Sequence, residues 1–98
     1  MQFLYKMHVA GKEKLLAICD KNILGKTFEE KDLNITVSEE FYSGNGCDEK
    51  AAVKLMEDAT IINAVGREII GLMIRKSIVS EDNVLYISSV PHAQAVSA

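Results

Sequence analysis

The chain has 98 residues, the length of one domain, and its 48% hydrophobic and 26% charged content is the balance of a globular protein. Eleven basic residues against fourteen acidic ones give a net charge of -3, which is not the footprint of a general nucleic-acid binder. No apolar run approaches the roughly 20 residues of a membrane span, and the N-terminus lacks a secretion pattern. We therefore expect one cytoplasmic domain over residues 1–98, with a flexible tail at about 95–98 and no membrane contact.

The start of the chain predicts a β-hairpin. Residues 1–9 alternate between two faces, and residues 13–20 become apolar on both faces toward their end, which indicates a central strand. Gly11 lies between the two strands and tolerates the positive φ of a tight turn. Cys19 lies in the apolar run of the second strand, so we expect it in the core.

The segment that follows is harder to assign. Asp20 is expected to cap a single helical turn that Gly25 closes. Residues 33–38 alternate like a third strand with one polar face. The stretch at residues 44–46 predicts a loop, which would leave the neighbouring Cys47 exposed.

Two helices are expected next. Asp48 caps an amphipathic helix over residues 49–59, and a second, strongly apolar helix is predicted over residues 60–79. The second helix contains Gly66 and Gly71, each of which costs about 1 kcal/mol relative to alanine. Such glycines suggest the close approach of another backbone, from a strand or from a second subunit, so a homodimer through this helix is one expectation.

One more strand completes the expected fold. Residues 80–83 predict a turn and residues 84–90 a final strand, which Pro91 ends because it cannot donate a ladder hydrogen bond. The order strand, strand, strand, helix, helix, strand predicts an α+β two-layer sandwich. Its sheet is expected to have four mainly antiparallel strands, with the two helices packed on one face.

The motifs of nucleotide, metal and thiol chemistry are absent or incomplete. "LGKTF" matches three residues of a phosphate-binding loop, but Asp20 stands where that loop needs a glycine, and an acid repels phosphate. The histidines and cysteines show no metal-ligand spacing. We therefore expect no metal and no cofactor.

Two groups of residues are better candidates for a binding site. Thr60, Asn63 and Arg67 share one polar stripe of the second predicted helix, which is either its solvent face or a group that faces the end of the sheet. In the second case these residues can hydrogen-bond Pro91, His92 and Gln94, or hold a ligand carboxylate or phosphate. His92 is otherwise a surface histidine near the C-terminus.

The stretches "AICDKNILGKTF", "VSEEFY", "DATIINAVG" and "VPHAQ", in this order and spacing, resemble an archaeal uncharacterised family called domain of unknown function 424. The resemblance spans roughly residues 3 to 94. It implies a compact α+β domain of archaeal, cytoplasmic origin and implies no activity. The positions that match the family pattern, and are therefore site candidates, are Gly25, Lys26, Thr60, Asn63, Gly66, Pro91, His92 and Gln94.

The leading hypothesis is a non-catalytic binding module that serves RNA or a protein of the translation machinery. Residues 1–27 carry five lysines against two acidic residues, so a basic face is possible there, although lysines on exposed strand positions are the alternative. The second hypothesis is a small-molecule-binding protein or enzyme with its site near Asn63, Arg67 and His92. Whether the protein is an enzyme stays open at this stage.

Overall fold

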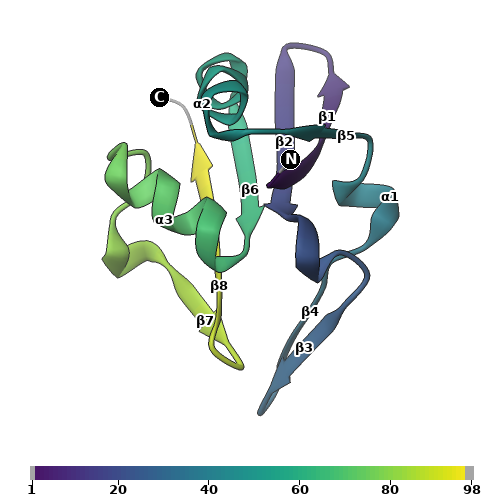
Figure 1. The fold of residues 1–98 in the computed structure, drawn as a ribbon, viewed down its shortest axis with the longest axis vertical. Coiled ribbons are helices and arrows are strands. Elements are labelled where there is room, and N and C mark those ends of the chain that lie inside the picture. Colours follow the sequence, from purple (N-terminus) through teal and green to yellow (C-terminus); the bar gives the residue numbers. More distant parts are fainter. Residues whose placement is uncertain (1, 97–98) are drawn as a thin grey trace.

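The computed structural model describes residues 2–96, which form a six-stranded mixed sheet and a separate two-stranded hairpin. The large sheet has the strand order β5-β1-β2-β6-β8-β7, and β3 pairs with β4 (Figure 1). The strands are β1 (Phe3–Ala10), β2 (Glu13–Asp20), β3 (Thr27–Glu30), β4 (Leu33–Thr36), β5 (Asn45–Cys47), β6 (Ile61–Val65), β7 (Leu85–Ile87) and β8 (Val90–Val96). The helices are α1 (Glu39–Tyr42), α2 (Glu49–Asp58) and α3 (Arg67–Arg75), with short 3-10 helices at η1 (Lys21–Ile23) and η2 (Glu81–Asn83).

The N-terminal hairpin and the amphipathic helix lie where the sequence predicts them. β1 and β2 pair along their whole length, and Gly11 makes the turn with a φ of 60°. β2 lies between β1 and β6, and Cys19 on it is fully buried, as expected of a central strand. Asp48 caps α2, since its Oδ1 accepts a hydrogen bond of 2.9 Å from the backbone N–H of Ala51.

The predicted fold class is wrong, because the first part of the second predicted helix is a strand. β6 pairs in parallel with β2 and antiparallel with β8, so the main sheet has six strands in mixed directions instead of four. A short apolar run such as Ile61–Val65 has the pattern of a buried strand and of a buried helix alike. The change of structure falls at Gly66, whose φ of 126° favours glycine and turns the chain from β6 into α3.

The C-terminal part also differs from the expectation. Ser88 and Ser89 have φ values of 49° and 66° and turn the chain sharply, so the expected single strand is two strands, β7 and β8. The usual glycine or asparagine of such a turn is missing here, which hid the hairpin from sequence analysis. Pro91 does not end a strand but lies within β8.

The hydrogen bonds around Pro91 explain why β8 tolerates a proline. The Pro91 carbonyl accepts a hydrogen bond from the backbone N–H of Gly66 at 3.0 Å. In an antiparallel pair the N–H and C=O of one residue point to the same partner, so the N–H that proline lacks would also point toward Gly66. The Gly66 carbonyl already accepts from the N–H of Ile70 at 3.1 Å, in the first turn of α3. Proline therefore removes no ladder hydrogen bond at this position.

The short elements β3, α1 and β5 carry weak sequence patterns and were not expected. Residues 33–38 do contain a strand, β4, but it pairs with β3 outside the main sheet. β5 pairs with β1 and buries Cys47, which is 4% exposed, so the expectation of an exposed Cys47 is wrong. β5 has only three residues and overlaps a glycine-rich stretch, so the sequence predicted a loop instead of an edge strand.

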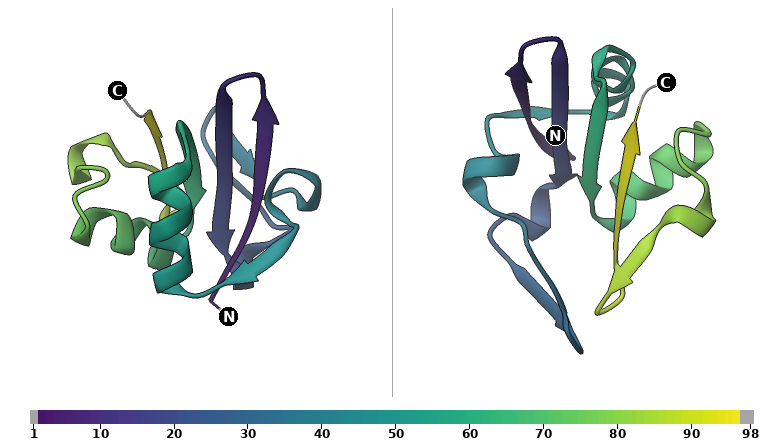
Figure 2. Two further views of the ribbon diagram at one scale, coloured as in Figure 1. Left: turned by 90° about the horizontal axis from the view of Figure 1, so that it is seen from above. Right: turned by 180° about the vertical axis from the view of Figure 1, so that it is seen from behind.

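Each face of the main sheet packs against its own core. The helix-side core joins the sheet to α2 and α3, and it includes Phe3, Leu16, Ile18, Met56, Ile69 and Met73. The outer-face core joins the opposite face of the sheet to the segment between β2 and α1, and it includes Ala17, Cys19, Val37, Tyr42 and Val65. The right panel of Figure 2, which views the molecule from behind, shows this outer face with α1 and the β3–β4 hairpin beside β1 and β2.

The remaining expectations concern the end of the chain and the membrane. Residues 95 and 96, expected in a flexible tail, are the last two residues of β8, and residues 97 and 98 lie outside the described part. Among residues 2–96 there is no helix with the length and apolar content that crossing a membrane requires.

Candidate functional site

The carboxyl ends of β2 and β6 form the most site-like feature of the fold. The two strands are parallel neighbours, paired from Leu15↔Ile61 to Cys19↔Val65. After β2 the chain crosses to the outer-face core, whereas after β6 it crosses to the helix side as α3. Neighbouring parallel strands whose connections leave to opposite faces open a crevice at their carboxyl ends, where open α/β sheets bind ligands.

A cavity of about 320 Å³ lies at this point, and we call it the switch-point crevice. Its polar lining consists of Asp20, Asn22, Lys26, Arg67 and Glu68. Ile23, Phe28 and Val90 supply its apolar walls. The crevice therefore combines residues from the end of β2, the β3 strand, the start of α3 and the start of β8.

Asp20 closes the bottom of the crevice by capping α3. Its carboxylate accepts the backbone N–H groups of Glu68 and Ile69, both at 2.9 Å, and the residue is 4% exposed. Burial raises the pKa of Asp20, and the hydrogen bonds from Glu68 and Ile69 offset part of that increase. The expectation that Asp20 caps the 3-10 turn η1 is wrong, because its side chain makes no hydrogen bond there.

The Asp20 cap has a consequence for ligands. The free N–H groups of a helix N-terminus are the usual place for a bound phosphate. In α3 two of these groups are already bonded to a carboxylate of the same chain. An anion in the crevice must therefore be held by side chains rather than by the α3 backbone.

Two cationic side chains remain for that role. Lys26 and Arg67 both line the crevice, and neither forms an ion pair or a side-chain hydrogen bond with any residue in 2–96. Arg75, in contrast, pairs with Glu49 at 3.3 Å, and Lys14 pairs with Asp58 at 3.2 Å. The two crevice cations are thus available to a ligand.

A second cavity adjoins the crevice at Arg67. This groove has a volume of about 550 Å³ and runs between α3 and the β7–β8 turn. Ile70, Gly71, Ile74, Tyr86 and Pro91 form its apolar part, and Glu30, Arg67 and Ser89 its polar part. We call it the α3 groove.

The two hairpin tips meet beside the α3 groove. The backbone N–H of Ser88 donates to Oε1 of Glu30 at 2.8 Å, and the Ser88 hydroxyl donates to the Glu29 carbonyl. Both tips lie at the lower end of the molecule in Figure 1. This contact holds the β3–β4 hairpin against the β7–β8 turn and so limits the width of the groove.

Asn63 and His92 meet on the outer face of the sheet, as one of the alternatives drawn from the sequence supposed. Asn63 Oδ1 accepts from the Tyr42 hydroxyl at 2.8 Å and lies 3.0 Å from His92 Nε2. When Nε2 carries the proton, both neighbours donate to the same oxygen. Burial lowers the pKa of His92, so the imidazole is neutral at physiological pH.

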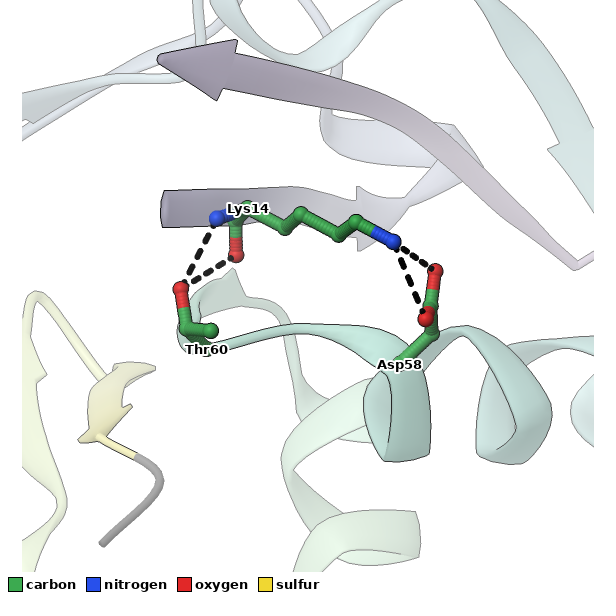
Figure 3. Close-up of polar contacts among 3 residues, drawn as sticks. All are labelled: Lys14, Asp58 and Thr60. Carbon is green, nitrogen blue, oxygen red and sulfur yellow. Dashed lines mark hydrogen bonds and ion pairs between the residues drawn. The ribbon is translucent and has the colours of Figure 1, made fainter. Parts of the chain in front are cut away.

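The grouping of Asn63 with Thr60 and Arg67 on one helix stripe is wrong, because Asn63 is in β6. Arg67 begins α3, and its side chain forms no hydrogen bond with Asn63 or His92. Thr60 precedes β6 at the amino end of the strand, where its hydroxyl accepts from the Lys14 backbone N–H at 2.8 Å (Figure 3). Thr60 holds the start of β6 against β2, and the nearby Lys14–Asp58 ion pair joins β2 to the last residue of α2 (Figure 3).

The other candidates occupy separate places. Gly25 makes a turn with a φ of 86°, and its N–H bonds to the Val37 carbonyl at 2.7 Å, which positions Lys26 beside the crevice. Gln94 is exposed on β8 opposite Asn63. The structure therefore brings Lys26 and Arg67 to the crevice, and Asn63 and His92 to the outer face.

Two residues that contact the candidate sites were not selected from the sequence: Asp20, which caps α3 beside the crevice, and Tyr42, which donates to Asn63. Asp20 stands at the end of an apolar strand, and a buried acid there requires donors that only the fold supplies. Tyr42 is 3% exposed, and no sequence pattern links it to Asn63, which lies 21 residues away.

The two thiols are poorly suited to nucleophilic chemistry. Burial raises the pKa of Cys19 to about 12, and it also raises the pKa of Cys47. Both cysteines are free, and neither forms a hydrogen bond with His8 or His92 within residues 2–96. The described part of the chain also contains no cluster of three or more acidic, histidine or cysteine side chains that could hold a metal ion.

The mixed sheet, with separate cores on its two faces and a crevice at its switch point, defines a small α/β domain. The family model described as "Protein of unknown function (DUF424)" matches residues 7–97, so the chain belongs to that family. The chain is also similar to a solved structure, that of an uncharacterized conserved protein from Methanopyrus kandleri. The two are 29% identical with a TM-score of 0.79, over 94% of this chain and 88% of the other. No curated protein sequence matched the chain.

Proposed function

We propose that this protein is a non-catalytic binding module whose ligand or partner contacts the switch-point crevice. The observation that carries the proposal is the pair of unpaired cations, Lys26 and Arg67, beside a cavity at the switch point of the sheet. The raised thiol pKa values argue against cysteine catalysis, which supports a binding role over an enzymatic one.

RNA, or a protein of the translation machinery, is the partner class that the sequence suggests, and it remains part of this proposal. The sequence suggested this partner class because lysines gather near the N-terminus, but in the fold these lysines lie at opposite ends of β2. Lys12 and Lys14 lie at the hairpin turn of β1 and β2, whereas Lys21 and Lys26 lie beyond the other end of β2. Lys21 and Lys26, which are both exposed, are therefore the lysines that would contact a phosphate backbone, from the surface beside the crevice.

The alternative is a small-molecule-binding protein or enzyme with a site at Asn63, Arg67 and His92. The hydrogen bond between Asn63 and His92 favours it, but Arg67 opens onto the crevice and the α3 groove instead. A site built from all three residues has less support than one built around Arg67 alone.

Affinity purification of the tagged protein from its native lysate tests the proposal. We expect a partner that is retained by the wild type and lost from a Lys26→Glu/Arg67→Glu variant, because reversed charges repel an anionic contact. A Lys50→Glu/Lys54→Glu variant on α2 is the matched control and should retain the partner. Sensitivity to ribonuclease identifies RNA, and a partner retained equally by both variants rejects the crevice as the site.

An archaeal origin and a cytoplasmic location belong to the same proposal. The similarity to a Methanopyrus kandleri protein supports the first. The two free cysteines support the second, because thiols persist in a reducing compartment.

A further inference from the structure

Among residues 2–96, Arg67 is the one residue that lines both the switch-point crevice and the α3 groove. It is the first residue of α3 and its position follows from the cap, because Gly66 and Asp20 fix where the helix begins. The side chain is exposed and has no acidic partner within residues 2–96. A guanidinium in this state presents a planar pair of donors that matches a carboxylate.

The α3 groove beyond Arg67 is mostly apolar. Ile70, Ile74 and Pro91 form its walls, and Tyr86 covers one side with 48% of its surface exposed. Gly71 leaves open space on the helix, since a Cβ built there would meet only Nη1 of Arg75 at 3.5 Å. The groove therefore has room for an apolar or aromatic body next to the guanidinium.

The charges around the two cavities limit how anionic the ligand can be. Lys26 and Arg67 are opposed by the carboxylates of Asp20, Glu30 and Glu68. Asp20 is hydrogen-bonded to the α3 backbone and one oxygen of Glu30 to Ser88, which keeps both carboxylates in the lining. A triphosphate held inside the two cavities would be repelled by these carboxylates, whereas a single carboxylate at Arg67 is compatible with them.

We propose that the crevice and the α3 groove together bind a small monocarboxylate with an apolar or aromatic body, the carboxylate on Arg67 and the body along Ile70, Gly71 and Tyr86. This inference rests on the proposed binding function and gives it a ligand class. The two cavity volumes, about 320 and 550 Å³, fall in the range of small-molecule sites.

A titration of the ¹⁵N-labelled full chain with 4-phenylbutyrate, followed by NMR, tests the ligand class. We expect saturable shifts at the amides of residues 66–74 and 86–91. Removing the charge with Arg67→Gln should raise the dissociation constant about tenfold or more, since a charge-assisted hydrogen bond is lost. Filling the groove with Gly71→Leu should abolish the shifts, and thermal unfolding should show that this variant stays folded, because leucine favours a helix over glycine.

The controls separate the proposal from weaker explanations. Lys76→Gln, at the other end of α3, should bind as the wild type does, and 4-phenylbutyramide, which lacks the charge, should bind more weakly than the acid. Equal binding of the amide, tighter binding of inorganic phosphate, no saturable shift with the acid, or a dissociation constant within twofold for Arg67→Gln would each overturn the ligand class. If the ligand class fails while the partner in the lysate is still lost with Lys26→Glu/Arg67→Glu, the proposed binding function stands.

Discussion

Asn63 and His92 lie 29 residues apart in the chain and meet on the outer face of the sheet, with 3.0 Å between Asn63 Oδ1 and His92 Nε2. The same oxygen accepts the hydroxyl of Tyr42, which is buried. The Asn63 side-chain amide thus joins α1, β6 and β8, and its removal should destabilise the packing of all three elements.

We expect Tyr42→Phe to reduce the free energy of unfolding by about 1 kcal/mol, since Asn63 Oδ1 keeps His92 as a partner. Asn63→Ala should cost more, about 2–3 kcal/mol, because it leaves the buried Tyr42 hydroxyl without an acceptor. Urea unfolding of the two variants measures both values. Equal costs for the two would contradict the shared hydrogen bond.

The stability of the protein should fall on acidification through His92. Burial lowers its pKa below the ordinary value of 6.5, so the unfolded chain takes up this proton at a pH where the folded chain does not. The contribution of neutral His92 to the free energy of unfolding is therefore complete above the pKa of His92 in the unfolded chain. It is lost as the pH falls through the pKa of His92 in the folded protein. From about pH 7.5 to about pH 5, the wild type should lose more stability than His92→Gln.

Denaturant unfolding of the wild type and of His92→Gln at each pH measures this difference. Parallel profiles for the wild type and His92→Gln would show that His92 does not titrate differently in the two states.

Gly66→Ala should be among the most destabilising single changes in the chain. A Cβ at this position would stand 2.5 Å from Asp20 Oδ2, and the φ of 126° strains any side chain. We expect a loss of about 3 kcal/mol or more in thermal or denaturant unfolding. Gly71→Ala, in the same helix with open space around it, is the control and should be neutral or stabilising by up to about 1 kcal/mol.

The same steric conflict can be tested by a double-mutant cycle. Asp20→Gly removes every Asp20 side-chain atom that occupies the space, the Cβ at 2.8 Å included, so Gly66→Ala should cost less in that background than in the wild type. Strictly additive costs would show that the backbone conformation alone, and not the Asp20 side chain, requires glycine.

Neither thiol should react quickly in the folded protein. Burial raises the pKa of Cys19 to about 12 and also raises the pKa of Cys47, so little thiolate exists at about pH 8. Ellman's reagent should therefore titrate both cysteines only after denaturation. Rapid modification of one thiol in the native state would identify a reactive cysteine that the structure does not account for.

The parts of the fold that sequence analysis predicted are those with a long, unmixed pattern. β1 has an alternating pattern, β2 is apolar on both faces toward its end, and Gly11 lies between them, while α2 has both a cap at Asp48 and an amphipathic face. β6 was predicted as helix because four apolar residues and Asn63 run directly into α3, and only the partner strands β2 and β8 decide between the two structures.

The candidate site shows the same limit. Asn63, His92, Lys26 and Arg67 were selected as residues, but the grouping of Asn63 with Arg67 depended on a helix where the structure has β6. Side chains from three or more segments meet in the crevice, and such distant pairings leave no periodic trace in the sequence. Asp20 was assigned to a local turn because local caps are common, whereas its real partners are 48 and 49 residues away.

That distance affects the order in which the protein can fold. Excised from the chain, α3 would be a nine-residue segment without its cap, too short to be stable as a helix in water. The Asp20 carboxylate reaches its backbone only when β2 and β6 are side by side. The first turn of α3 is thus stable only when the parallel pair of β2 and β6 has formed. Formation of α3 therefore indicates that the middle of the sheet has assembled.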